Sequence, residues 1–465
     1  DTAEKLIRGE NSKIIKDDTL LSEVAGLVEW PVVLLGRIDE EFLTLPKEIL
    51  QVSMKEHQKF FSVINIATGL IDRFIVVANI VSKDGGKSVL EGNSRVLRSR
   101  LKDAKFFFEK DLDEMKDKSF VELNKRLEAV TFHNKVGSQM DRVSKIRSFS
   151  VKIAKLLKVD VQTCDQVANL CKTDLTTKVV SEFPELQGIM GSIYCKLEGM
   201  EETIYNAISN HYKPLTQNDV VPNEMVSIVV AIADRVSTLV SFWAIGEKPT
   251  GSKDPFALRR GAIGLIRILV ENRLNLKLSD LIGNSLNSET AQDLYNFIAE
   301  RFKVYLVEKG FSHDLLQACL KLDSFKNPYV VFTIVDQLNK FKKDESFSRL
   351  MYAYRRPNNI LVSEENKAKR KFELEPVEKF FSTVEEKKLM QKLLSSEQLV
   401  ITSMLKNDYI SAFRILADLD EVVEEFFENV TINSEVPEEK ENRLYLCNKV
   451  RKIMHLLAKF SELEG

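Results

Sequence analysis

The spacing of apolar residues constrains this chain more than any other feature of its sequence. From Arg95 to the C-terminus, apolar residues recur every three or four positions. In residues 142–158 they form one stripe, and lysines and arginines occupy the opposite side. Amphipathic segments of this length are typical of α-helices that pack around a shared core. The sequence therefore predicts a mainly α-helical protein, with further helices at residues 224–245, 256–271, 291–308 and 440–460.

The N-terminal region differs from the rest because it contains short runs of β-branched residues bounded by turn residues. Residues 30–35, 49–53 and 74–80 have this composition, which is typical of strands. The chain begins at Asp1 without an initiator methionine, in what resembles the middle of a helix. We therefore expect an incomplete N-terminal α/β module in a chain that lacks the start of its protein.

The length of the chain predicts several domains, because 465 residues exceed what one hydrophobic core usually serves. A polar, lysine-rich stretch at residues 362–375 predicts an exposed loop or surface insertion. We expect an N-terminal module at residues 1–125, a central helical domain at 126–290, a helical linker at 291–345 and a C-terminal helical bundle at 346–465.

Composition argues against several classes of protein. The 67 lysines and arginines nearly balance 69 acidic residues, so any contact with nucleic acid must come from local basic patches. The five cysteines are scattered and form no C-x-x-C pair, which argues against a disulfide framework and fits a reducing cytoplasm. No uninterrupted apolar run reaches the roughly 18 residues that span a bilayer, so we expect no contact with a membrane.

Only two short stretches resemble catalytic motifs. Residues 84–88 (DGGKS) resemble part of a phosphate-binding loop, but Val81 stands where that motif needs a glycine, so we interpret them as a turn between strands. His313 and Asp314 could suggest a metal site, yet the five histidines are spread out and none is paired at helical spacing. We interpret that pair as the start of a helix. No catalytic residue and no metal ligand is predicted.

Two dense polar segments distinguish this sequence from other helical proteins. Residues 182–188 (EFPELQG) predict a helix end, a turn containing proline and a new helix, with Phe183 and Leu186 packed inward. Residues 251–260 (GSKDPFALRR) predict a loop whose Ser252 or Asp254 caps a helix beginning near Pro255. Both segments can thus be explained by structure alone.

Blocks of residues along nearly the whole chain resemble the β subunit of the bacterial heterotetrameric glycyl-tRNA synthetase. The chain resembles a fragment of that subunit that lacks its N-terminal part. The blocks are residues 27–34 (LVEWPVVL), 54–61 (MKEHQKFF), 91–97 (EGNSRVL), 100–108 (RLKDAKFFF), 172–176 (KTDLT), 182–188, 251–260 and 460–463 (FSEL).

The resemblance implies a division of labour between two subunits. A separate α subunit would use ATP and Mg to form the glycyl adenylate, whereas this chain would bind no cofactor itself. Its expected partners are that α subunit and tRNA(Gly), in a cytoplasmic α2β2 assembly that attaches glycine to tRNA. A scaffold that only dimerises the α subunit is an alternative.

The resemblance also implies that the central domain is similar to HD-type helical domains, which bind a metal through a His-Asp pair. Lys172 lies where the histidine of that pair is expected, and Asp234 lies where a closing aspartate is expected. An ammonium group has no free lone pair, so lysine is no practical metal ligand near neutral pH. We therefore predict an inactive, metal-free pocket. The alternative is a metal-dependent HD-type phosphohydrolase.

Three basic residues in the second polar segment are candidate contacts to tRNA. Lys253 would lie at a helix N-terminus, whose free backbone N–H groups can bind a phosphate. Arg259 and Arg260 would lie on the first turns of the same helix, within reach of that phosphate. Ion pairs within the domain are the alternative role for these residues.

The region from residue 346 onward resembles the helical anticodon-binding domain that this family shares with arginyl-tRNA synthetases. At 100° per residue, the last helix has a polar side opposite a core side that contains Leu446, Val450 and Ile453. A basic side with interleaved Asn and His suits single-stranded RNA, although a solvated face balanced by nearby glutamates is an alternative. The tRNA-binding residues predicted here are Arg355, Arg356, Asn358, Asn442, Arg443, Asn448, Arg451, Lys452 and His455.

Overall fold

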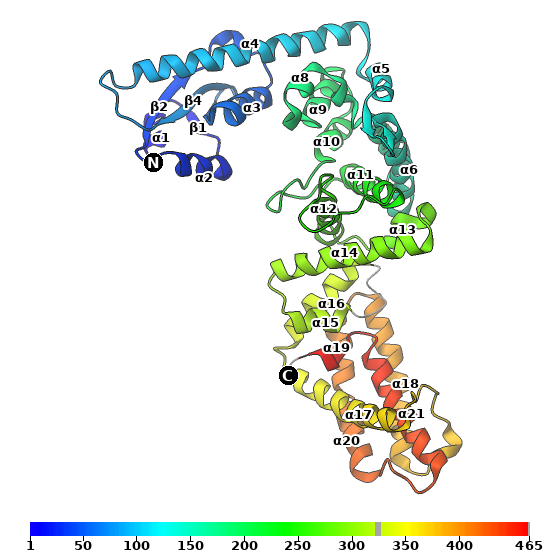
Figure 1. Ribbon diagram of the computed structural model, residues 1–465. Helices are drawn as coiled ribbons and strands as arrows, with labels where there is room; N and C mark the ends of the chain where they lie inside the picture. Colours follow the sequence, from blue (N-terminus) through cyan, green and yellow to red (C-terminus); the bar gives the residue numbers. More distant parts are fainter. Residues whose placement is uncertain (321–326, 464–465) are drawn as a thin grey trace. The chain divides into compact units, whose positions relative to one another are not determined.

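The computed structural model describes residues 1–320 and 327–463, which form two compact units, Asp1–Ser241 and Phe242–Gly465 (Figure 1). Most described residues lie in helices, so the prediction of a mainly α-helical, multidomain protein is confirmed. The division between the units falls inside the segment predicted as one central domain. The finer boundaries at residues 125, 290 and 345 stay predictions.

The first unit opens with a four-stranded antiparallel sheet in the order β1-β3-β4-β2. The strands are β1 (Ser12–Ile14), β2 (Val32–Arg37), β3 (Phe61–Asn65) and β4 (Ile71–Ala78). Two of them, β2 and β4, confirm the strands predicted at residues 30–35 and 74–80.

The strand predicted at residues 49–53 is wrong, because these residues belong to helix α3 (Lys47–Gln58). The buried residues of α3 are Ile49, Leu50, Ser53 and Met54. Their spacing of one, three and one positions places all four on one face of a helix. The apolar run was too short to distinguish a strand from a buried helical segment.

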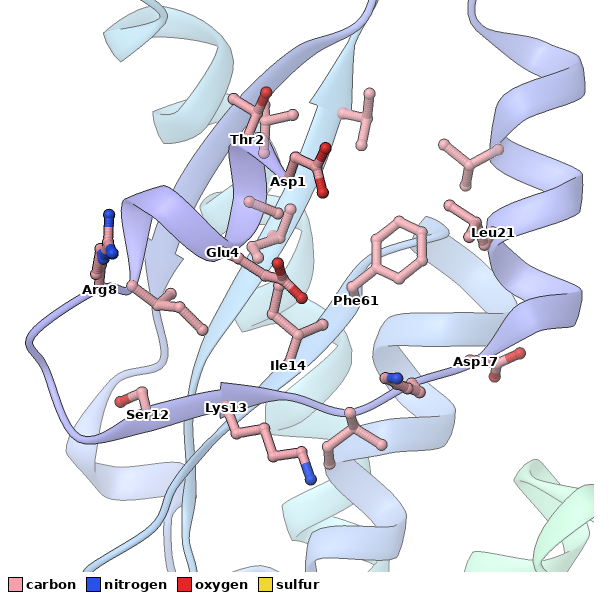
Figure 2. Close-up of a pocket in the computed structure, with 18 of the residues that line it drawn as sticks. Asp1, Thr2, Glu4, Arg8, Ser12, Lys13, Ile14, Asp17, Leu21 and Phe61 are labelled. Atoms are coloured by element: carbon pink, nitrogen blue, oxygen red, sulfur yellow. The ribbon is translucent and has the colours of Figure 1, made fainter.

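One face of the sheet is only partly covered. Leu34 points to the face where α4 (Lys87–Asp117) begins, because it lies against Gly86 just before that helix. On the opposite face, Val33, Phe61 and Ile75 line a cavity of about 1100 Å³, which is bordered by the short helices α1 (Thr2–Leu6) and α2 (Asp18–Leu27) (Figure 2). The core on this face is accordingly small.

Residues 84–88 lead from β4 into α4, so the predicted turn between two strands is instead the start of a helix. Gly85 and Gly86 have φ values of 70° and 92°, a region that favours glycine. The carboxylate of Asp84 accepts hydrogen bonds from the backbone N–H groups of Gly86 and Ser88. This helix N-terminus therefore carries its own carboxylate partner.

The remainder of the first unit is largely helical, apart from the small antiparallel pair β5 (Thr131–His133) and β6 (Gly137–Ser138). No strand was predicted after Arg95, so this pair is a correction to the sequence-based prediction. The main helices here are α5 (Phe120–Leu123), α6 (Gln139–Leu157), α7 (Val161–Leu170), α8 (Lys178–Glu182), α9 (Ile189–Leu197), α10 (Glu202–Asn210) and α11 (Met225–Ala244), of which α11 belongs to this unit as far as Ser241.

A buried carboxylate ties α4 to this helical part. Asp111, near the end of α4, accepts hydrogen bonds from the backbone N–H groups of Lys178 (2.7 Å) and Val179 (3.0 Å) at the start of α8. It also accepts one from the hydroxyl of Tyr194 on α9, at 2.8 Å. A single side chain thus connects three helices.

The structural interpretation of residues 182–188 is confirmed. Helix α8 ends at Glu182, a short 3-10 turn covers Pro184–Leu186, and α9 begins at Ile189. Phe183 and Leu186 are buried, as predicted.

Helix α11 is long and apolar enough to cross a membrane by length and composition, but 83% of the relevant window is buried inside the chain. Asp234 and Arg235 interrupt its apolar run, so no uninterrupted apolar stretch in the sequence is long enough to span a bilayer.

The second unit consists of helices joined by loops. They are α12 (Leu258–Glu271), α13 (Leu278–Ile282), α14 (Ser288–Glu308), α15 (His313–Leu320), α16 (Pro328–Phe341), α17 (Ser346–Ala368), α18 (Val384–Leu405), α19 (Tyr409–Ala417), α20 (Asp420–Asn429) and α21 (Pro437–Met454). His313 begins α15, which confirms its predicted role. The loop predicted at 362–375 is wrong in its first half, because α17 continues to Ala368 and buries Glu364 and Glu365.

Candidate functional site

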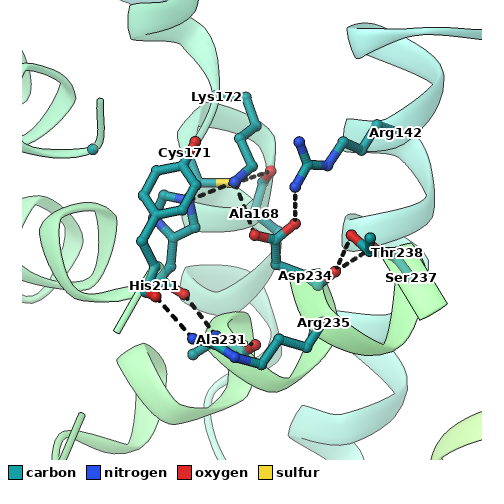
Figure 3. A network of polar contacts seen from close by, with 12 residues as sticks. Arg142, Ala168, Cys171, Lys172, His211, Ala231, Asp234, Arg235, Ser237 and Thr238 are labelled. Carbon is teal, nitrogen blue, oxygen red and sulfur yellow. Dashed lines mark hydrogen bonds and ion pairs between the residues drawn. The ribbon is translucent and has the colours of Figure 1, made fainter. Parts of the chain in front are cut away.

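The central part of the first unit contains a fully buried lysine with charged and polar partners (Figure 3). The Lys172 ammonium lies 2.9 Å from Oδ2 of Asp234 on α11 and 2.8 Å from Nε2 of His211, just after α10. It also lies 3.7 Å from the centre of the Tyr212 ring. Arg142 on α6 donates to the other carboxylate oxygen of Asp234, at 2.8 Å. We refer to these five residues as the Lys172 cluster.

The protonation states within the Lys172 cluster follow from burial and neighbouring charge. Burial lowers the pKa of Lys172 to about 8, although Asp234 favours the charged ammonium. Burial also opposes the ionisation of Asp234, but Arg142 and Lys172 outweigh it and hold the pKa of that carboxyl far below its usual range. Burial and the Lys172 charge lower the pKa of His211 well below its ordinary value. A neutral His211 can therefore accept at Nε2 and donate from Nδ1 to the Ile208 carbonyl, at 2.6 Å.

The residues of the cluster do not fit a divalent metal ion. Lys172 and Asp234 meet, as the HD-type resemblance implied, but the ammonium fills the space between the His211 nitrogen and the Asp234 oxygen. The Asp174 carboxylate is used elsewhere, because it accepts hydrogen bonds from the backbone N–H groups of Gly188 and Gly191 at the start of α9. Within residues 1–320 and 327–463, no group of three or more His, Cys, Asp or Glu side chains could hold a metal ion.

The predicted phosphate site at residues 251–260 is corrected by the structure. Helix α12 begins at Leu258, and the Asp254 carboxylate accepts hydrogen bonds from the backbone N–H groups of Leu258 and Arg259, both at 2.9 Å. The N–H groups that a phosphate would need are therefore already partnered by a carboxylate. Arg259 donates to the Gly251 carbonyl at 2.6 Å, whereas Lys253 and Arg260 are exposed.

The predicted basic face of the last helix is also wrong, because its central arginine points inward. Arg443 on α21 is buried and pairs with the fully buried Glu386, with Nε at 2.8 Å from Oε1. Its guanidinium also donates to the Thr431 carbonyl, the Ser382 hydroxyl and the Glu439 carboxylate. Angular position on a helix did not reveal that α18 and two loops cover this side.

Other polar residues of α21 also have partners within the second unit. Asn442 is buried and exchanges two hydrogen bonds with the backbone of Val377, at 2.7 and 3.1 Å. Asn448 is buried and accepts from Arg451, which also donates twice to Glu365. Lys452 is the exposed member of the predicted set on this helix, and it donates to the Glu373 carbonyl at 2.9 Å. These residues do not form one open basic surface.

His455 lies partly buried just after α21, where its Nε2 is 3.0 Å from the Tyr354 hydroxyl. Burial, together with the nearby charges of Arg451 and Lys459, lowers the pKa of His455 to about 4. Near neutral pH this histidine is therefore uncharged.

His455 should make the stability of the second unit depend on pH. A folded-state pKa of about 4 against an ordinary 6.5 means that folding favours the neutral imidazole. Its contribution is fully present above pH 6.5 and is lost as the pH falls towards 4, by up to about 3 kcal/mol. Urea unfolding of the chain and of His455→Gln at pH 7.5, 6 and 5 measures this. The two free energies should converge as the pH falls; a constant difference would contradict the assignment.

Helix α17 presents the polar side chains that do come together on an exposed surface. Arg355, Arg356 and Asn359 are exposed and line adjoining cavities of about 770 and 580 Å³. Asn358, which was predicted to bind tRNA, is half-buried and does not line either cavity. Asn359 was missed, although its position four residues after Arg355 places it on the same helical face.

Comparisons with known proteins match two parts of the chain to known families. Residues 1–321 match the model of the glycyl-tRNA synthetase beta subunit, and residues 350–460 match the DALR anticodon binding domain. The chain is thus a multidomain helical protein with a C-terminal anticodon-binding domain. It belongs to the family of glycyl-tRNA synthetase β subunits.

Curated relatives support the same family. The chain is 42% identical over 454 residues to a "Glycine--tRNA ligase beta subunit" of Ruegeria sp. (strain TM1040), covering 97% of this chain and 66% of that protein. It is 41% identical over 472 residues to the protein of the same name from Phenylobacterium zucineum, covering 100% of this chain and 68% of that protein. The chain therefore spans about two thirds of the length of these relatives.

Proposed function

We propose that this chain is a tRNA-binding β subunit that supports the ATP-dependent attachment of glycine to tRNA(Gly). The observation that carries the proposal is the exposed groove on α17, lined by Arg355, Arg356 and Asn359, inside the segment that matches an anticodon-binding domain. The adenylation site, with its ATP and Mg, would belong to a separate α subunit. We place the complex in the cytoplasm as an α2β2 heterotetramer.

The groove on α17 combines the two kinds of contact that single-stranded RNA requires. Arg355 is exposed and has no ion-pair partner among the described residues, so its guanidinium is available to a phosphate. Arg356 lies 4.8 Å from the centre of the Phe427 ring and donates to the Phe427 carbonyl, which restricts its orientation. Tyr352, with 43% of its surface exposed, offers a ring on which a base can stack. Stacking and phosphate contacts together are typical of single-strand recognition.

Charge reversal in the groove tests the proposal. The double variant Arg355→Glu, Arg356→Glu should bind a tRNA(Gly) transcript about 10- to 100-fold more weakly, because two cations are lost and two repulsive charges are gained. The slope of log affinity against log salt should also become shallower by about two. Filter binding or fluorescence anisotropy at several salt concentrations measures both quantities.

The matched control is the double variant Lys387→Glu, Lys406→Glu, which changes the same charge at exposed positions on and after α18. Its tRNA affinity should stay within about twofold to threefold of the unmodified chain. Equal losses in the two double variants would indicate a general effect of charge and would reject the groove as the binding surface. Unchanged affinity in both would also reject the groove, whereas no measurable binding by the unmodified chain would favour a scaffold that only assembles the α subunit.

The proposed partner protein can be tested separately by co-purification with a glycyl-tRNA synthetase α subunit. The alternative role as a metal-dependent phosphohydrolase is not favoured by the chemistry of the Lys172 cluster. A protonated lysine lies between His211 and Asp234, the two groups there that could ligate a metal.

A further inference from the structure

We propose that His211, Tyr212 and Asp234 form a cation-binding site that the chain fills with the ammonium of its own Lys172. This inference concerns the first unit and does not depend on the proposed binding of tRNA. The site would serve as a structural cross-link in which a tethered lysine takes the place of a bound cation.

The surroundings of Lys172 are those of an ammonium-binding site. A carboxylate oxygen of Asp234 lies at 2.9 Å and the His211 Nε2 at 2.8 Å, while the Tyr212 ring presents its face at 3.7 Å. An ammonium group has three N–H donors and no acceptor, so it suits an anionic oxygen, a neutral imidazole lone pair and a π face. Lys172 itself is fully buried, so its ammonium depends on these partners rather than on solvent.

The walls of the site are held in place from α11. Arg235, next to Asp234, donates to the backbone carbonyls of His211, Tyr212 and Pro214, at 3.1, 2.8 and 3.2 Å. The segment that carries two of the three ammonium partners is therefore anchored to the helix that carries the third. This arrangement exists independently of the Lys172 side chain.

The charge of the cluster explains why a tethered ammonium fits better than a free metal ion. Arg142 and Lys172 contribute two positive charges, while His211 is neutral. Asp234 contributes one negative charge, and the nearby Asp174 carboxylate also interacts with Lys172. A divalent ion beside Arg142 would add further positive charge to a buried site in which Asp234 is the carboxylate that contacts the cation. A monovalent ammonium leaves less excess charge, and its covalent tether removes the need to capture a cation from solution.

Removing the lysine side chain should leave a site for a small amine. Lys172→Ala deletes the equivalent of n-propylammonium and leaves a buried carboxylate oxygen and an imidazole nitrogen without that partner. The melting temperature of the first unit should fall by about 10 °C. Adding n-propylammonium chloride should raise it again, by roughly 3–6 °C at ten times the dissociation constant. Thermal unfolding of the 465-residue chain, followed by circular dichroism, measures both shifts.

Three comparisons make the result specific. 1-Propanol has a similar shape without charge, and sodium chloride supplies equal ionic strength; neither should stabilise Lys172→Ala as propylammonium does. Lys145→Ala removes an exposed lysine on α6 whose ammonium bonds to the Ser241 hydroxyl, at 3.1 Å. That variant should melt within about 2 °C of the unmodified chain and should not respond to the amine.

Two melting results would overturn the cation site. Equal stabilisation by propanol and propylammonium would mean that the space is an ordinary cavity, and would overturn the proposal. An unchanged melting temperature in Lys172→Ala would do the same. If the variant is insoluble, refolding from urea with and without propylammonium takes the place of melting. Recovery only with the amine supports the cation site, and no recovery in either case overturns it.

Discussion

Replacing Arg443 with methionine should lower the free energy of unfolding of the second unit by about 3–5 kcal/mol. The change keeps the volume and the apolar stem of the side chain but removes the guanidinium that pairs with Glu386, which is fully buried. The carboxylate of Glu386 would retain only hydrogen bonds from the hydroxyl and backbone of Ser382 and the backbone of Thr383. Urea denaturation, followed by the loss of helical signal in far-UV circular dichroism, gives the free energy of unfolding.

Arg370→Met is the matched control for this experiment. Arg370 pairs with Glu441 at the surface, where its side chain is 50% exposed. Exposed pairs contribute little, so this variant should lose less than about 1 kcal/mol. A similarly small loss for Arg443→Met would show that the buried pair does not hold the domain together.

The second large effect is expected at Asp111, where alanine should cost about 3 kcal/mol or more. The substitution leaves two backbone N–H groups at the start of α8 and the Tyr194 hydroxyl without their shared acceptor. Each buried donor left without a partner costs about 1–3 kcal/mol. Hydrogen exchange at the amides of Lys178 and Val179 should accelerate together with the loss of global stability.

Two variants separate this interpretation from a general effect of changing α4. Asp113→Ala, two residues further on, removes an exposed carboxylate that pairs with the exposed Lys116, and should change stability by less than about 0.5 kcal/mol. Asp111→Asn keeps one of the two acceptor oxygens, which can serve the Val179 N–H and the Tyr194 hydroxyl but not the Lys178 N–H, and should lose less than Asp111→Ala. If alanine and asparagine are equally harmful, the hydrogen-bond explanation is wrong.

Helices were more predictable from the sequence than the environment of their polar side chains. Periodicity placed α6, α11, α12 and α14 within about three residues of their observed bounds, whereas α21 ends at Met454 rather than at the predicted residue 460. It failed for α3, where only a short apolar run was available, and at β5 and β6, which are too short to produce a pattern. Local spacing determines a helix, but it does not show which other element covers each side.

At the candidate site too, the sequence predicted some of the residues that meet but not their surroundings. Lys172 and Asp234 were paired through their resemblance to a known domain type, and they do meet. His211 and Tyr212 were missed because they follow α10 without any motif, 39 positions from the lysine in the case of His211. Arg443 and Asn442 were assigned to an RNA surface because their charge and polarity suit one. Their buried partners, Glu386 and the Val377 backbone, are distant in sequence and gave no signal.

The path of α4 has a consequence for how the first unit comes apart. This 31-residue helix contacts α3 and β2 along its first part and α8 through its last part (Figure 1). With a length of about 46 Å, α4 packs against both the sheet region and the helical region. If either region detached from α4, it would expose the apolar side chains of that helix. The partly covered sheet is therefore stabilised, through α4, by the packing of α8 against the other end of the same helix.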